Sequence, residues 1–309
     1  MMTQRNTVET EPSGVLIVNK HKGVTSHDIV NKIRRLYHTR RVGHTGTLDP
    51  MATGVLVVLI GRAAKAAEYL SHDEKCYRAH LRLGMTTDSE DVTGTILTQT
   101  DQIPPFSALT EILPSFRGTI QQVPPMYSAL KVGGKKLVDL AREGKTVERQ
   151  PRAVEIFALN AAPLPDTTDI LLEVHCSGGT YIRTLCADLG AALGCGGVMA
   201  ELERTMACGF HLSQGHTIDE LEKMTDEERA ALLIPTEALF QGVPALKLPA
   251  FYEKLCRSGC EIYLSKLRAT LCEGDRVRLC DEKGEFFALG EVFLYPDGLA
   301  VKAIKTFVL

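Results

Sequence analysis

The sequence predicts an α+β fold followed by a small all-β domain. Strand-like and helix-like segments follow one another without the regular β-α-β repeat of a parallel sheet. Beyond a segment rich in proline and glycine near residues 235–248, the chain shows strand alternation with two turn signals. A length of 309 residues and a hydrophobic content of 44% are enough for two domains. We therefore expect a disordered polar tail at residues 1–13, a large domain at 14–240 and the all-β domain at 245–309.

The first part of the large domain contains three expected strands and one helix. The apolar stretch 14–20 is typical of a short strand, and 55–60 of a fully buried one. Residues 77–84 alternate between apolar side chains and Arg or His, as in a strand with one buried face. Over residues 26–38 the apolar positions recur on one face of a helix, for which Ser26 is the expected N-cap.

The later part of the chain is punctuated by glycines. Residues 123–145 predict an initial turn, a strand, a glycine turn and a short helix. Residues 170–194 predict a strand, a glycine break and a helix that Gly194 ends. In the all-β domain, the triplets at 282–284 and 296–298 are typical of the turns that join neighbouring strands.

The distribution of charge is more informative than its sum. The formal net charge is −3 and the pI is about 6.3, unlike a compact basic nucleic-acid binder. Residues 15–48, however, hold seven Lys or Arg against one acid, and residues 131–152 hold seven against three. For any single charge, a solvated helix face is the alternative explanation. Together the two stretches favour a polyanionic partner.

The cysteines indicate a reduced, cytoplasmic protein without a metal site. The nine cysteines include no CxxC pair, which argues against a disulfide framework. The spacing of the last four fits no zinc pattern, although they lie within 25 residues of one another: Cys256, Cys260, Cys272 and Cys280. The first residues lack the apolar core of a signal peptide, and the apolar run at 54–61 is too short to span a membrane.

The stretch "GHTGTLDPMATG" at residues 43–54 presents a single carboxylate, Asp49, among small residues. An Asp-Pro turn opener is the simpler explanation for it. The chain contains no GxxxxGK[ST], GxGxxG, HExxH or GxSxG signature, so Asp49 is the best candidate for a reacting group. A carboxylate can act as a nucleophile at a sugar carbon or as a general base.

A cationic partner for Asp49 is available in "TYIRT" at residues 180–184. Tyr181 and Arg183 are two apart, so on a strand they would point the same way. An arginine paired with Asp49 would keep it ionised. The rings of Tyr77 and Tyr181 could enclose a planar substrate between them. Tyr77 could instead be a core residue, and Arg183 could serve a structural ion pair.

The sequence resembles the TruB-type bacterial tRNA pseudouridine synthases. The resemblance runs from about residue 14 to the end of the chain. It rests on five stretches in the family's order: "GVLIVNKHKGVTSHDIV", "RVGHTGTLDPMATGVLVVLIGRAAK", "KCYRAHLRLGMTTDSEDVTG", "VPPMYSALKVGGKKLVDLAREG" and "SGGTYIRTLCADLGAALGCGG". The family's fold is a mixed, largely antiparallel-sheet catalytic domain, and the C-terminal segment is similar to its small PUA-like domain.

The resemblance implies a role for each of the candidate residues. It identifies Asp49 as the catalytic residue, either attacking C1′ of the ribose or removing a sugar proton, and Arg183 as its ionic partner. Tyr77 would stack on the target uracil. The resemblance adds the remaining residues that would bind the flipped nucleotide or lie near it: His44, Tyr181, Leu202 and Lys20. Val138 and Glu203 depart from the family, which often has Tyr at the first position and a basic residue at the second. The acid at Glu203 would weaken a phosphate contact beside Arg204.

The implied reaction converts the T-loop uridine at position 55 of tRNA into pseudouridine after base flipping. It requires no cofactor and no metal, because no group is donated and no redox change occurs. The expected partner is the T-arm stem-loop of tRNA, and the expected state is a monomer without an obligatory protein partner. Two other functions compete with this one. The chain could be a tRNA-binding folding factor in which Asp49 is incidental, or an aspartate-dependent hydrolase of small nucleosides.

Overall fold

The computed structural model describes residues 11–70, 73–165 and 167–308. Most of the expected N-terminal tail, residues 1–10, lies outside the described residues. The end of that tail is in contact with the large domain, because the carboxylate of Glu11 pairs with Arg41 at 2.8 Å. Within the described ranges, no helix combines the length and apolar character needed to cross a membrane.

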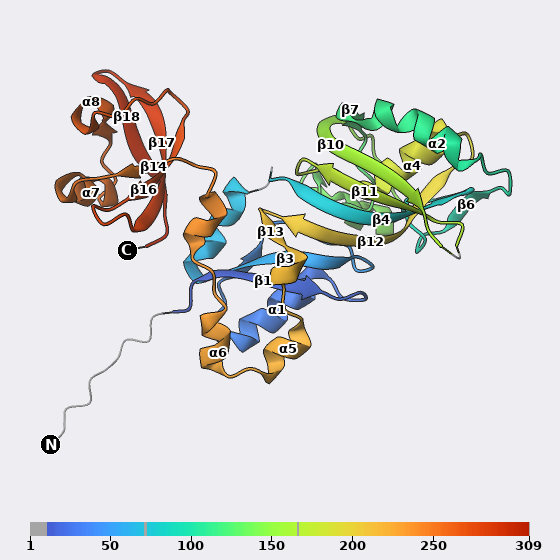
Figure 1. Ribbon diagram of the computed structural model, residues 1–309, viewed down its shortest axis with the longest axis horizontal. Helices are drawn as coiled ribbons and strands as arrows, with labels where there is room; N and C mark the ends of the chain where they lie inside the picture. Colours follow the sequence, from blue (N-terminus) through green and yellow to red (C-terminus); the bar gives the residue numbers. More distant parts are fainter. Residues whose placement is uncertain (1–10, 71–72, 166, 309) are drawn as a thin grey trace.

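A mixed sheet forms the centre of the large domain (Figure 1). Its main path, in spatial order, consists of β1 (Gly14–Lys20), β3 (Thr53–Ile60), β12 (Gly197–Ala207), β4 (Lys75–Leu83), β11 (Ile170–Cys176), β10 (Arg152–Pro163) and β7 (Gly118–Gln122). Two short strands pair at the side of this path, β2 (Val42–His44) with β3 and β13 (Phe210–His211) with β12. All neighbouring strands are antiparallel except β12 and β3, which are parallel. This confirms the α+β prediction.

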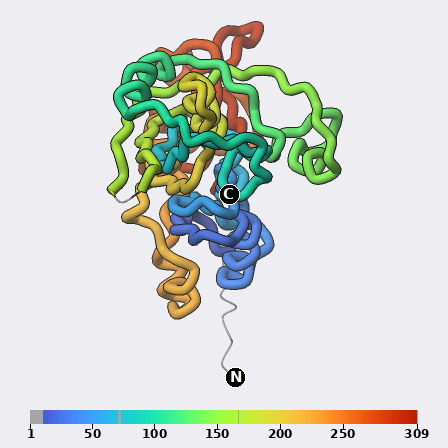
Figure 2. Tube along the Cα trace, turned by 90° about the vertical axis from the view of Figure 1, so that its right-hand side faces the viewer, coloured from blue at the N-terminus to red at the C-terminus, as the bar shows by residue number. Residues whose placement is uncertain are grey.

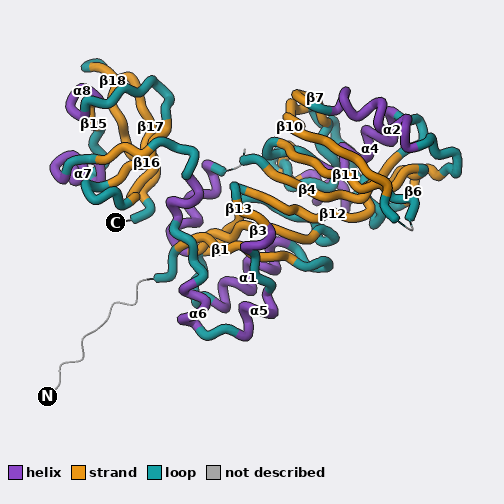
Figure 3. Tube along the Cα trace, in the orientation of Figure 1, coloured by secondary structure: helices purple, strands orange, loops and turns teal. Residues whose placement is uncertain are grey.

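Helices cover different parts of the sheet, as the secondary-structure colouring in Figure 3 shows. Under β1 and β3 lie α1 (Ser26–Leu36), α5 (Ile218–Lys223) and α6 (Asp226–Ala231). Over β4 and β11 lie α2 (Phe106–Ile112) and α4 (Ile182–Ala192). The alternation of β4 sends Tyr77, Ala79 and Leu81 into the core beneath α4. Short elements complete this domain: η1 (Gly61–Tyr69), η2 (Leu113–Phe116), η3 (Leu212–Gln214), η4 (Thr236–Phe240) and the hairpin β5 (Met85–Thr87)–β6 (Ile96–Gln99).

Helix α1 begins one residue earlier than its expected cap would place it. Thr25, not Ser26, is the N-cap, and it forms a capping box with Asp28. Our prediction for Ser26 was therefore wrong. Both residues are good cap formers, and the acid three residues after Thr25 decides between them. Ser26 is buried and binds the loop that carries Asp49 instead.

An arm (residues 129–148) projects from the large domain. It contains β8 (Lys131–Val132), β9 (Lys135–Lys136) and α3 (Leu137–Arg142). In Figure 2 this green segment stands away from the rest of the trace. The predicted strand, glycine turn and short helix are present, although each strand is only two residues long. Most arm residues are exposed, so the sheet does not fix their position by burial.

The C-terminal domain is a five-stranded sheet that packs on η1 (Figure 1). Its strands, in spatial order, are β14 (Ala245–Lys247), β16 (Arg276–Cys280), β17 (Phe286–Tyr295), β18 (Gly298–Thr306) and β15 (Ile262–Tyr263). It also carries two short helices, α7 (Ala250–Arg257) and α8 (Leu264–Leu267). Both expected turns occur, and Gly284 and Gly298 have the positive φ values that such turns require. Of the clustered cysteines, Cys256 and Cys280 are buried and Cys260 and Cys272 are exposed.

Candidate active site

The loop between β2 and β3 carries Asp49, whose neighbours Leu48 and Met51 belong to a buried apolar cluster. A turn closes over it, because the Ala52 N–H donates to the Asp49 carbonyl at 3.0 Å. The Asp49 side chain remains 33% exposed, so it is accessible to a ligand. Its carboxylate forms an ion pair with Arg183, with Nε 2.9 Å from Oδ2, and Arg183 Nη2 donates a hydrogen bond to Oδ1 at 3.3 Å. Charge-assisted contacts of this kind are stronger than hydrogen bonds between neutral groups.

Arg183 is itself held from several sides. It is 5% exposed, and it donates to the carbonyls of Ser89 at 3.0 Å and Tyr127 at 2.8 Å. Its guanidinium also lies 4.0 Å from the carboxylate of Asp91. These groups surround a buried cation with acceptors, which is the condition for keeping a charge inside a protein. The Arg183 guanidinium therefore presents its remaining donors to Asp49 in a fixed direction.

Tyr181 and Arg183 do not lie on a strand, so our prediction that they point the same way was wrong. β11 ends at Cys176, and the left-handed conformation of Gly179, with φ of 88°, separates it from α4. Tyr181 is the N-cap of α4 and Arg183 lies in its first turn. Positions two apart on a helix do not face each other. The contact between Asp49 and Arg183 forms from the helix N-terminus instead.

Three buried side chains anchor the Asp49 loop through its backbone. Lys20 donates to the carbonyls of Ala52 at 2.5 Å, His21 at 3.1 Å and Pro50 at 3.3 Å. The Ser26 hydroxyl accepts from the Leu48 N–H at 2.8 Å and lies 3.1 Å from the Leu48 carbonyl. Arg204 forms the third anchor, described below. No local sequence pattern distinguishes these anchors from ordinary polar residues. Except for the contact between Lys20 and its neighbour His21, each anchor lies at least 22 positions along the chain from the residue that it binds.

Arg204 holds the two ends of the loop together. It donates to the carbonyl of Gly46 at 3.1 Å and to that of Val55 at 2.7 Å. Its side chain is only 1% exposed, so the phosphate contact expected beside Glu203 cannot come from Arg204. Gly54 allows this close approach. A Cβ at that position would lie 2.2 Å from the Arg204 carbonyl oxygen, and its φ is 99°.

The electrostatics of the site follow from burial. Burial raises the pKa of Asp49 above its ordinary value, while the neighbouring Arg183 opposes the shift. Burial also lowers the pKa of Lys20 to about 8, with the charge on Asp49 acting in the opposite direction. Burial lowers the pKa of His44, and the positive charge of Arg204 adds to this effect. The imidazole is therefore neutral near pH 7.

Three of the remaining candidates are Tyr77, Leu202 and His44. Tyr77 and Leu202 are each 8% exposed, and both belong to the buried cluster that contains Leu48 of the Asp49 loop. Burial raises the pKa of Tyr77 to about 12, so its hydroxyl stays protonated. His44 ends β2, and its Nδ1 is buried with no hydrogen-bond partner among the described residues.

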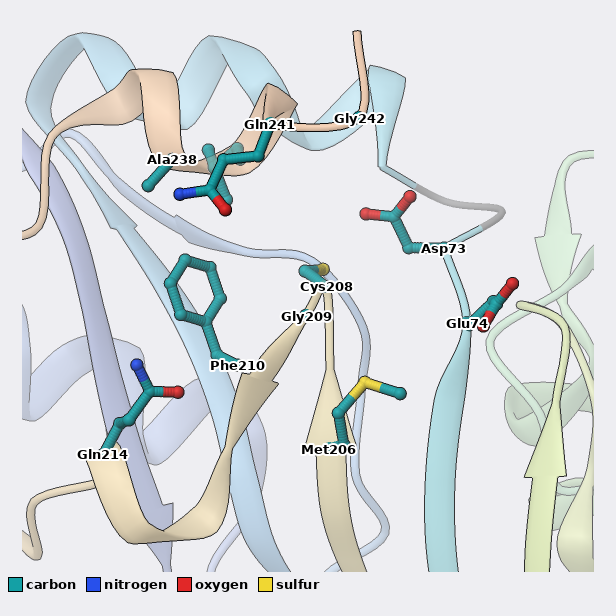
Figure 4. A pocket seen from close by; sticks show the side chains of 11 residues that line it. Asp73, Glu74, Met206, Cys208, Gly209, Phe210, Gln214, Ala238, Gln241 and Gly242 are labelled. Atoms are coloured by element: carbon teal, nitrogen blue, oxygen red, sulfur yellow. The ribbon is translucent and has the colours of Figure 1, made fainter.

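Two hollows, neither of them lined by Asp49, differ in charge. A crevice of about 450 Å³ is lined by Asp73, Glu74, Cys208 and the side chains shown in Figure 4. Its carboxylates make it unsuitable for a phosphate, and Asp49 does not line it. The other hollow, of about 580 Å³, combines backbone and apolar atoms with four basic side chains: Arg40, Arg41, Arg62 and Lys65. We call this second one the basic hollow.

The described residues contain no group of three or more His, Cys, Asp or Glu side chains arranged to hold a metal ion. The candidate side chains Asp49, Arg183, His44, Tyr77 and Tyr181 offer a carboxylate, a guanidinium, an imidazole and two phenols. A carboxylate held by a guanidinium beside aromatic and aliphatic walls suits a reaction at a sugar carbon next to a planar base.

Comparisons with known proteins identify the family of the chain. The family model described as "TruB family pseudouridylate synthase (N terminal domain)" matches residues 34–182. The model described as "tRNA pseudouridylate synthase B C-terminal domain" matches residues 183–241. The boundary between the two matches falls between Ile182 and Arg183, so the site draws Asp49 from the first match and Arg183 from the second.

Curated relatives named tRNA pseudouridine synthase B match over most of their length. The protein of Alkaliphilus oremlandii is 41% identical over 91% of this chain and 93% of its own. That of Burkholderia mallei is 41% identical over 93% and 97%, respectively. Among solved structures, a chain in the crystal structure of a Cbf5-Nop10-Gar1 complex matches with a TM-score of 0.73 and 25% identity. That match covers 96% of this chain and 85% of the other.

Proposed function

The chain belongs to the TruB family of pseudouridylate synthases, and we propose that it isomerises the T-loop uridine of tRNA, at position 55, to pseudouridine with Asp49 as its catalytic residue. The relatives' name supports tRNA as the substrate. The observation that carries the assignment of Asp49 is its hydrogen-bonded ion pair with the buried Arg183, formed while a third of the Asp49 side chain stays open to a ligand.

The reaction moves one bond of the nucleoside. The bond between C1′ and N1 breaks, the uracil turns within the site, and C1′ bonds to C5. The C5 proton then leaves to solvent and N1 takes up a proton. Atoms and charge balance without a donor or an oxidant, so no cofactor is needed. We propose that ionised Asp49 reacts at the ribose and that Arg183 keeps it ionised and aimed.

The buried residues Tyr77, Leu202 and Leu48 support a role for this site in retaining the base. Tyr77 offers a protonated aromatic ring for stacking, and base–aromatic stacking is worth about 1–3 kcal/mol per base. Leu202 and Leu48 provide an apolar lining that excludes water from the sugar. We assign the unpartnered Nδ1 of His44 to the flipped nucleotide and place Tyr181 at the pocket rim. Lys20 acts on the loop backbone and not on the base.

We propose that the T-arm of tRNA binds across the basic hollow and the arm. The hollow lies where β2 and η1 meet, at the end of β3 away from the Asp49 loop, and the segment that leads into the arm contacts Arg183 through the Tyr127 carbonyl. We propose that the chain acts as a monomer without an obligatory protein partner. The cysteines within the described ranges are free, which fits a reducing cytoplasm.

The proposal is tested with a tRNA transcript carrying tritium at uridine C5. The protein is incubated with it without any cofactor, and the Asp49→Asn variant is treated in the same way. We expect tritium release by the parent and none by the variant, with equal binding of tRNA by both. Tight binding without release from either protein would instead support a folding factor. Release from free uridine but not from tRNA would support a nucleoside enzyme.

A further inference from the structure

Gln122 joins the end of β7 to the start of α4 through both ends of its side-chain amide. Its Oε1 accepts from the Tyr181 N–H at 3.0 Å, and its Nε2 donates to the Tyr181 carbonyl at 3.2 Å. The two residues lie 59 positions apart, and Gln122 is 1% exposed. The amide thus pairs with one backbone residue as a neighbouring strand would.

This contact replaces the usual cap of a helix. Tyr181 is the N-cap of α4, but its side chain makes no capping hydrogen bond. Ser, Thr, Asp and Asn are the residues that normally cap a helix from within. Gln122 instead fixes the cap residue from outside, because it holds the N–H and the carbonyl of Tyr181 at once. The Tyr181 carbonyl also accepts the first helical bond, from the Leu185 N–H at 3.0 Å.

The first turn of α4 bears the two site residues whose direction matters most. Tyr181 carries its ring from the cap itself, and Arg183 follows two residues later with its guanidinium on Asp49. The segment that begins at Gln122 touches this turn a second time, since the Tyr127 carbonyl accepts from Arg183. A rotation of the peptide at Tyr181 would therefore displace Arg183 from both Asp49 and Tyr127.

We propose that Gln122 is a positioning residue for the isomerisation, acting through the Tyr181 backbone on Arg183 and, through Arg183, on Asp49. This inference rests on the function proposed above. Gln122 does not contact Asp49 in the structure, and its buried amide has no access to the tRNA surface. Its loss should therefore lower the rate of the chemical step and leave tRNA affinity unchanged.

The test compares two substitutions with a neighbouring control. Gln122→Met retains the length of the side chain and removes both hydrogen bonds. Gln122→Glu keeps the acceptor, but when ionised it faces the Tyr181 carbonyl without a proton. When protonated, it can both accept and donate again. The matched control is Gln121→Met, which alters the same residue type one position earlier on the exposed face of β7.

Single-turnover tritium release and tRNA binding are measured from pH 6 to pH 9, each variant relative to the parent. Because a displacement of about 1 Å can reduce a rate by about a hundredfold, we expect a loss of roughly that size for Gln122→Met. The Kd for tRNA should stay within about threefold of the parent, because the basic hollow and arm are untouched. The relative rate of Gln122→Glu should rise as the pH falls, while that of Gln122→Met stays low at every pH. Gln121→Met should match the parent.

Three results separate the possible failures. Parent-like rates in both Gln122 variants would overturn the inference, as would a pH-independent relative rate for Gln122→Glu. A loss of tRNA affinity with a normal rate at saturation would also overturn it. Absence of release from the parent would contradict the proposed function instead. If Gln122→Met does not fold, amide hydrogen exchange at Tyr181 in Gln122→Glu at the two pH extremes still reports whether protonation restores the contact.

Discussion

The Asp49 loop and the segment that leads into the arm both contact Arg183, yet the protein holds the loop and the arm in opposite ways. The loop is fixed through its backbone by the buried side chains of Lys20, Ser26 and Arg204. The arm has two strands of two residues each and a one-and-a-half-turn helix, and most of its side chains are exposed. Only its base, where the Tyr127 carbonyl accepts from Arg183, is tied to the site.

The difference separates two requirements of the proposed reaction. A group that reacts at one carbon must be held within a fraction of an ångström, which requires buried and satisfied contacts. A surface that follows a phosphate backbone gains affinity from charge and tolerates movement. Substitutions in the two regions should therefore separate cleanly, with rate affected by the loop and affinity by the arm.

The largest effect should come from Arg183→Met. The change removes the ion pair and the hydrogen bond to Asp49 and releases the carbonyls of Ser89 and Tyr127. We expect the single-turnover rate to fall about a hundredfold to a thousandfold, as when a preorganised donor is removed from an active site. The rate is measured by tritium release at saturating tRNA. Arg142→Met, on the exposed arm helix, is the control and should keep the parental rate under these conditions.

Lys20→Met should lower both rate and stability. Three carbonyls of the loop and its neighbour lose their donor in a buried place, which costs at least about 2 kcal/mol of unfolding free energy. The freed loop should also lower the rate at saturating tRNA by about tenfold or more. Urea unfolding and tritium release measure the two effects. Lys22→Met is the matched control, because the Lys22 side chain is 59% exposed. Equal losses in both variants would argue against a specific anchor.

Replacing Lys131, Lys135 and Lys136 by Gln should affect affinity alone. These lysines are exposed at the tip of the arm, so their removal should weaken tRNA binding and reduce its salt dependence. We expect the slope of log K against log salt to change by about one unit per lost phosphate contact. The rate at saturation should not change. Lys223→Gln, in the acidic segment of α5, should leave the slope as it is, and a reduced saturating rate in the triple variant would contradict the separation.

The smallest effect concerns the pH dependence of stability. Burial raises the pKa of Asp49, so between its ordinary and its raised value the folded protein binds more protons than the unfolded chain. The contribution of Asp49 to stability is thus fully present at low pH and declines as the pH rises through the raised pKa. Asn at this position cannot ionise. The Tm of Asp49→Asn minus that of the parent should therefore increase with pH across this window, and a decrease would contradict a raised pKa.

The sequence was sufficient where local chemistry decides the structure. Apolar periodicity predicted β1, β3 and β4, and the motif around Asp49 identified the residue that the structure brings to Arg183. It failed where a distant contact decides. Serine is a residue type that often caps helices, but the hydrogen-bond partner of Ser26 is Leu48, 22 positions away. Arg204 stands in a polar stretch typical of a surface strand, but β12 runs parallel to β3 at that point and buries it. Alternation along one strand does not indicate which strand will lie beside it.

Tyr181 and Arg183 show the same limit in another form. The glycines before them mark a break in the chain, but the break could lead back into a strand or into a helix. The buried face that α4 presents to β4 and β12 decides between these alternatives. Gln122, which fixes the start of that helix, is the last residue of β7. The sequence of β7 shows only the alternation of a short edge strand, which does not indicate this contact.

The junction between the large domain and the C-terminal sheet has a consequence for how the gene can change. Phe240 packs against the stacked rings of Phe286 and Phe307, with centroid distances of 5.9 and 5.6 Å, and this aromatic group belongs to the same buried cluster as residues of η1. Lys305 pairs with Glu68 on η1 itself. A premature stop codon ahead of β14 would leave this apolar surface open to water at the end of β3, the strand that closes the Asp49 loop. We therefore expect the two domains to be inherited as one unit. A truncated chain would expose this apolar surface and would be degraded by proteases, whatever RNA contacts it had lost.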